Sequence, residues 1–77
     1  MYEAIFIEGE ACSKCMMMKP HCKKRAEENG YDFQVFRFDD ENIKQFNIQS
    51  VPMMILQMNG VVLEVLNEEG IVNKISK

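Results

Sequence analysis

The stretch GEACSKCMMMKP (residues 9–20) holds two of the chain's three cysteines, and two residues separate them. From Ser13 the chain reads as a helix, and Asn29-Gly30 is a typical helix stop. The residues that recur at helical spacing, and that we expect to be buried, are Cys15, Met18, Cys22 and Ala26. Cys12 is therefore predicted at or just before the first helical turn, with Cys15 one turn further in.

This placement suits thiol chemistry. Free backbone N–H groups and the helix dipole favour negative charge at a helix N-terminus, so a Cys12 thiolate is stabilised there. Lys14 adds a nearby cation, although solvent screens an exposed lysine. Cys15 shares a helix face with Cys12, so its sulfur can reach the first sulfur. The pattern predicts thiol–disulfide exchange, in which Cys12 attacks as the nucleophile and the shielded Cys15 resolves the mixed disulfide.

A metal site is the competing interpretation. Cys12, Cys15, His21 and Cys22 could be assembled around zinc only if the helix were broken. In a continuous helix Cys22 lies about 10 Å along the axis from Cys15, and zinc–sulfur bonds of about 2.3 Å cannot bridge that gap. We therefore expect no metal ligands and a buried, inert Cys22.

A soft-metal carrier for copper or mercury, using Cys12 and Cys15 with methionine help, stays open as an alternative. The methionines concerned are Met16, Met17, Met18, Met53 and Met54. Core filling is the commoner use of methionine, and one or two of these side chains could form an apolar collar around the sulfurs.

Composition places the chain among small globular proteins. Its 77 residues are 47% hydrophobic and 27% charged, which predicts a single domain over residues 1–77. No apolar run approaches the roughly 18 residues of a membrane span. The first ten residues lack the basic flank of a signal peptide, so we expect a cytoplasmic monomer. A Cys-x-x-Cys pair in that compartment is more often catalytic or metal-binding than structural.

Charge excludes some partners. The net charge of −3 predicts neither a nucleic-acid nor a membrane partner. Five of the nine basic residues fall in one segment, namely Lys14, Lys19, Lys23, Lys24 and Arg25. They form either a solvated helix face or a patch that steers an acidic partner toward the cysteines.

The remaining elements follow from local patterns. Buried or alternating apolar runs predict strands at 2–7 and 32–38, and Asp39-Asp40 is predicted to cap a short helix at 41–47. Asn59-Gly60 joins strands 53–58 and 61–66 in a type I′ hairpin. A last short helix is expected within 68–77. The order β-α-β-α-β-β-α predicts an α/β fold with a mixed four-stranded sheet flanked by helices.

With the cysteine pair placed after a first strand, the chain resembles the thioredoxin-fold family. The residues that carry the resemblance are CSKC (12–15), Pro20, FDDEN (38–42) and FNIQSVPMMILQMNGVV (46–62). The match covers nearly the whole chain but lacks the N-terminal strand and helix of full-length thioredoxins, and the size is closer to glutaredoxins.

The resemblance implies a substrate site. It implies a cis peptide bond before Pro52, and a Val51 backbone that pairs with an extended substrate segment. Ala11 stands where thioredoxins have tryptophan, and Lys14 lies between the cysteines. These two residues complete the expected substrate-binding set.

The implied activity is reduction of protein disulfides, with no cofactor and with a reductase or glutathione as electron donor. A glutathione-dependent, glutaredoxin-like reductase is the nearest alternative, although NEEG (67–70) stands where glutaredoxins have a Gly-Gly turn. Phe6 replaces the buried acid of thioredoxins, so water or Glu8 must take the proton in the resolving step.

Overall fold

The computed structural model describes residues 1–76. Its elements in chain order are β1 (Tyr2–Glu8), α1 (Ser13–Glu28), β2 (Asp32–Arg37), the 3-10 helix η1 (Glu41–Phe46), β3 (Met53–Met58), β4 (Val61–Leu66) and α2 (Glu68–Ile75). This order confirms the predicted one, and the predicted ends differ by about one residue. Lys77, which closed the stretch predicted to contain the last helix, lies outside the described residues.

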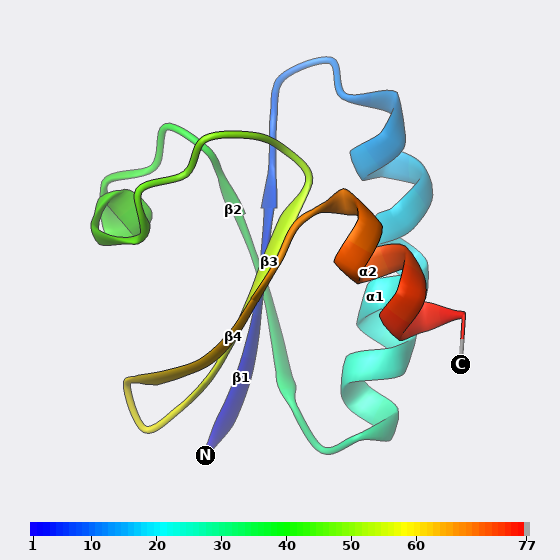
Figure 1. The fold of residues 1–77 in the computed structure, drawn as a ribbon, viewed down its shortest axis with the longest axis vertical. Helices are drawn as coiled ribbons and strands as arrows, with labels where there is room; N and C mark the ends of the chain where they lie inside the picture. The colour runs from blue at the N-terminus through cyan, green and yellow to red at the C-terminus, as the bar shows by residue number, and fades with distance from the viewer. Residues whose placement is uncertain (77) are drawn as a thin grey trace.

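The four strands form one mixed sheet in the order β2-β1-β3-β4. The crossover through α1 makes β1 and β2 parallel, whereas β1 pairs with β3, and β3 with β4, in antiparallel register. Asn59 and Gly60 have φ values of 51° and 82°, as a type I′ turn requires. Both longer helices cover one face of the sheet, and η1 lies on the other (Figure 1).

The two central strands supply a core to both faces. Ala4 and Phe6 point toward α1 and α2, whereas Ile5 and Ile7 point toward η1. All four are at most 5% exposed. Successive side chains of a strand alternate between faces, so a strand covered on both sides reads as an uninterrupted apolar run. This explains the sequence AIFI at residues 4–7.

The sheet's outer strand β4 is far less buried. Only Leu66 among its six residues is buried, while Val61, Val62, Leu63 and Val65 are between 44% and 61% exposed. The pairing of β4 with β3 is irregular beside Leu56 and Gln57. An irregular edge is a poor template for pairing with another chain.

The predicted stripe of α1 is confirmed. Cys15, Met18, Cys22 and Ala26 are the buried residues of this helix. Pro20 lies inside α1 and is exposed, and the helix continues through it. Within residues 1–76, no helix is both long enough and apolar enough to span a bilayer.

The second predicted helix is a six-residue 3-10 helix, about two turns long, rather than an α-helix. Asp40 caps it as expected, because its side chain accepts a hydrogen bond from the Asn42 backbone N–H at 2.8 Å. Asn47 adopts the left-handed conformation and ends it after six residues. 3-10 helices are frequent as connectors between longer elements, and η1 lies in the connection between β2 and β3.

Candidate functional site

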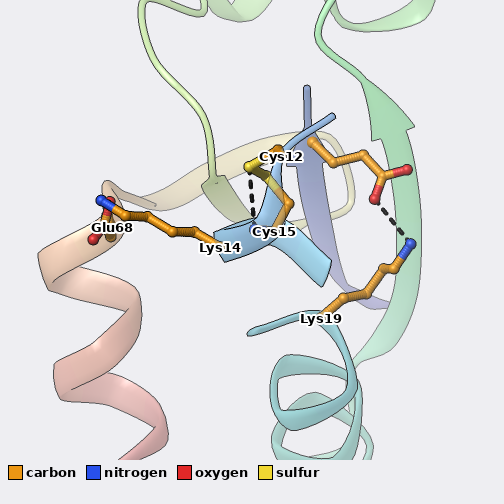
Figure 2. The surroundings of a disulfide bond; sticks show 6 residues. Cys12, Lys14, Cys15, Lys19 and Glu68 are labelled. Carbon is orange, nitrogen blue, oxygen red and sulfur yellow. Dashed lines mark hydrogen bonds and ion pairs between the residues drawn. A yellow bond between two sulfur atoms is a disulfide. The ribbon is translucent and has the colours of Figure 1, made fainter. Parts of the chain in front are cut away.

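Cys12 and Cys15 are joined by a disulfide at the start of α1 (Figure 2). Cys12 is the N-cap residue, with extended backbone angles, and is half-buried. Cys15 begins the buried stripe and is 1% exposed. One sulfur is therefore within reach of solvent while the other is enclosed by the core, which is the asymmetry that the sequence predicted.

The helix N-terminus faces the outer sulfur. The Cys15 backbone N–H donates a hydrogen bond to Cys12 Sγ at 3.1 Å. The first turn of α1 holds no acidic residue that would compete for this positive end of the helix. A negative charge that forms on Cys12 Sγ when the disulfide opens is accordingly stabilised by N–H groups and by the helix dipole.

The loop before β3 approaches the cysteine loop closely. The Val51-Pro52 peptide bond is cis, as the resemblance implied. Pro52 is buried, and Val51 is half-buried. A Cβ atom built on Gly9 would lie only 2.8 Å from Val51 Cγ2, so a side chain at position 9 would displace Val51. The structure therefore brings Val51 against the segment that leads into Cys12.

Ala11 shapes that segment through its backbone. Its φ of 52° lies in the left-handed region, which alanine seldom adopts. This turn reverses the chain after Glu10 so that Cys12 can cap α1. The sequence offered no signal for it, because alanine is a helix former and glycine is the usual residue at positive φ.

We predict that Ala11→Gly leaves the oxidised protein as stable as before, or more stable by up to about 1 kcal/mol, because glycine relieves the left-handed strain. Ala11→Val should instead cost more than about 1 kcal/mol, since β-branched residues tolerate this region poorly. Urea unfolding of the three proteins checks both effects. A clear loss of stability in Ala11→Gly would show that the turn carries no strain.

The Lys14 side chain extends toward Glu68 rather than toward the sulfurs (Figure 2). Its Nζ lies 3.3 Å from Glu68 Oε1 at the start of α2. Figure 2 shows this side chain extending away from the disulfide. The two side chains are 67% and 45% exposed, so the pair contributes little to stability. Glu68 offsets the charge that the sequence led us to expect at Cys12.

Glu8 and Phe6 bear on the resolving step. Lys19 Nζ donates to Glu8 Oε1 at 2.8 Å, and this pair is partly buried. Phe6 is fully buried and offers no proton acceptor beneath the cysteines. Glu8 is thus the carboxylate at the end of β1, and it is already held by a lysine from α1.

The third cysteine is separate from the pair. Cys22 is fully buried, and burial raises the pKa of its thiol from 9.0 to about 11. His21, its neighbour, is exposed. Within residues 1–76, no group of three or more His, Cys, Asp or Glu side chains is arranged to hold a metal ion.

The methionines divide between core and solvent. Met18 and Met54 are buried in the cluster beneath α1, and Met53 packs against the opposite cluster. Met16 and Met17 are 70% and 73% exposed. The core role is confirmed for the buried methionines, and the two that follow Cys15 directly lie on the surface.

A groove beside the cysteine site was not foreseen from the sequence. It has a volume of about 550 Å³ and lies between the loop before Pro52 and the first turns of α2. Its lining includes Val51, Glu68, Glu69 and Val72, and no basic residue of the described range 1–76 lines it. Acidic residues are common in the first turn of a helix, so Glu68 and Glu69 gave no sequence signal of their position next to Val51.

The sequence matches no family model and no curated protein. Solved structures do resemble the chain. Oxidised thioredoxin from Plasmodium falciparum is 18% identical, with a TM-score of 0.75, over 97% of this chain and 78% of that one. Thioredoxin 1 from Thermosipho africanus is 18% identical, with a TM-score of 0.77, over 96% and 90%.

Mitochondrial thioredoxin 3 from Saccharomyces cerevisiae is 20% identical, with a TM-score of 0.75, over 97% of this chain and 76% of that one. At identities this low, the structural similarity shows the fold and not the activity. The chain has the thioredoxin fold, with a Cys-x-x-Cys disulfide at the start of its first helix and a cis-proline before its hairpin.

Proposed function

We propose that the chain is a thiol–disulfide oxidoreductase that reduces protein disulfides in the cytoplasm. The observation that carries the proposal is the asymmetry of the cysteine pair. Cys12 caps α1, and its sulfur accepts a hydrogen bond from the Cys15 backbone N–H, whereas the Cys15 side chain is enclosed in the core. A pair built only as a staple needs no such difference between its two sulfurs.

Reduction of the partner's disulfide takes two electrons, and the Cys12–Cys15 dithiol supplies both. In the reduced protein the Cys12 thiolate attacks one sulfur of the partner's disulfide, and the partner's other sulfur leaves as a thiolate that takes up a proton. Cys15 loses its proton and attacks Cys12 Sγ. The Cys12–Cys15 disulfide forms, and the partner departs as a dithiol. A reductase or glutathione must then return two electrons to the pair.

Partner docking is proposed at the surface around Val51. An extended partner segment would pair with the Val51 backbone, next to Pro52 and the Ala11 turn, so that its disulfide meets Cys12. The close approach of Gly9 and Val51 supports this arrangement, because it leaves no room for a side chain at position 9 between the docking edge and the cysteine loop. Lys14, tied to Glu68, would border the same surface.

The groove next to Val51 leads us to predict a preference for basic partners. Glu68 and Glu69 line it with no basic residue of the range 1–76 in the lining. Lys14 pairs with Glu68 from outside the groove, but this pair is exposed and weak, and Glu69 adds a second negative charge. Charge complementarity raises association rates. A disulfide peptide with lysine beside its cysteine should be reduced about five-fold faster at low salt than its glutamate counterpart, and less so at high salt.

The double variant Glu68→Gln, Glu69→Gln should lose this preference, while Glu27→Gln, on the exposed face of α1, should keep it. Stopped-flow rates with the two peptides measure the effect. Equal rates for both peptides in the unaltered protein would rule out charge selection at this groove.

The proposed activity itself is tested by insulin reduction with dithiothreitol as electron donor, followed by turbidity. We expect the protein to accelerate precipitation well above the dithiothreitol control. Replacing dithiothreitol with glutathione separates the general reductase from the glutaredoxin-like alternative. Failure to accelerate insulin reduction in any reducing system would refute the proposal, and metal analysis of the reduced protein would then test the carrier alternative.

A further inference from the structure

A second cavity lies at the opposite end of α1 from the cysteine pair. Its volume is about 730 Å³, within the range of small-molecule sites. Met54 and Leu56 of β3 form its floor, and Ala26 of α1 and Ile75 of α2 contribute its apolar walls. The floor residues are at most 6% exposed and belong to the core, so their positions are fixed by packing.

The charged side chains that line this cavity, within the described part of the chain, are both basic. Arg25 and Lys74 line it, and among residues 1–76 no carboxylate does, although the chain has a net charge of −3. Lys74 Nζ lies 2.9 Å from Glu64, and Arg25 lies 3.9 Å from Glu28, and neither glutamate is part of the lining. Such surface ion pairs are weak, so the anionic group of a ligand can replace the glutamate as the partner of Arg25 or Lys74.

Two tyrosine rings also line the cavity. Tyr2 and Tyr31 both line it, and their ring centroids are 5.2 Å apart with the planes tilted by 52°. Tyr2 is 45% exposed, so its ring is available for further contact. Aromatic side chains favour offset or edge contacts with another ring.

We propose that this cavity binds a small amphipathic anion, with an aromatic body of about naphthalene size and one carboxylate. The body would lie on Met54 and Leu56 beside the tyrosines, and the carboxylate would meet Arg25 and Lys74. An apolar floor with a few convergent polar groups is the usual composition of a ligand site. The site shares no residue with the cysteine pair, so it does not depend on the proposed redox activity.

The test compares two ligands of equal size by NMR titration of the full chain. Naphthalene-2-carboxylate should shift the amide signals of Tyr31 and Ile75 and saturate. Naphthalene-2-carboxamide, which lacks the charge, should bind at least about five-fold more weakly. Absence of saturable shifts at these residues, or equal affinity for both ligands, would overturn the proposal.

Three variants locate the anion site. Arg25→Gln and Lys74→Gln should each weaken carboxylate binding by about five-fold and leave carboxamide binding unchanged. Lys24→Gln serves as the matched control, because Lys24 is an exposed cation of the same helix outside the cavity. An equal loss in Lys24→Gln would mean that general charge, rather than this cavity, attracts the carboxylate.

Discussion

Cys12→Ser should abolish disulfide exchange, whereas Cys15→Ser should still attack a partner and then stall. The outer sulfur is the one that solvent and the Cys15 N–H reach, and the inner sulfur is 1% exposed. Without Cys15 no neighbouring thiol can open the mixed disulfide. We expect turnover of protein disulfides to fall by at least about a hundred-fold in both variants, with a covalent partner adduct only in Cys15→Ser.

Non-reducing gel electrophoresis, with a reducing lane as control, detects the adduct. Cys22→Ser is the matched comparison, because it removes a thiol from the same helix and should retain turnover. If Cys12→Ser were the variant that traps partners, the two roles would be reversed. Normal turnover by Cys15→Ser without glutathione would mean that no resolving thiol is needed.

The second large effect concerns Cys22 at alkaline pH. Burial raises the pKa of this thiol in the folded protein to about 11, from 9.0. The folded state therefore favours the neutral thiol, and that stabilisation is complete below about pH 9 and is lost as the pH rises toward 11. At 1.36 kcal/mol per pKa unit, the loss amounts to up to about 3 kcal/mol.

Comparing the oxidised protein with Cys22→Ala isolates this contribution. Lysines and tyrosines titrate in both proteins, and the Cys12–Cys15 disulfide has no thiol that could titrate. Urea unfolding at pH 8, 9.5 and 11 should show the unaltered protein losing stability more steeply. Parallel curves would indicate that Cys22 titrates normally and is not enclosed by the core.

Much of the fold could be predicted because local patterns agreed with one another. The continuous apolar run of β1, the stripe beginning at Cys15 and the Asn59-Gly60 turn each specify one element, and the order of elements leaves few topologies. The cis bond before Pro52 came from the family resemblance rather than from the residues alone. The N-cap position of Cys12 followed from where the helical spacing begins.

The rest depended on contacts between distant parts of the chain. Glu68 meets Lys14 across 54 residues of sequence, so its effect on the cysteine site appears only after folding. The positive φ of Ala11 is imposed by the junction between β1 and α1. The exposure of β4 reflects its place at the edge of the sheet, which a strand's own composition does not reveal.

The most direct test of the proposed dithiol chemistry is a labelling rate measured at each cysteine. The reduced protein is treated briefly with iodoacetamide at several pH values, and peptide mass spectrometry reports the labelled fraction of all three thiols. Thiolates react, so the thiol at the helix N-terminus should react first. We predict that Cys12 is labelled fastest. It should already react at pH values below roughly 8.5, which is the pKa of a free cysteine, while Cys15 and Cys22 stay protected. Faster labelling of Cys15 or Cys22, or equal labelling of all three, would contradict the account.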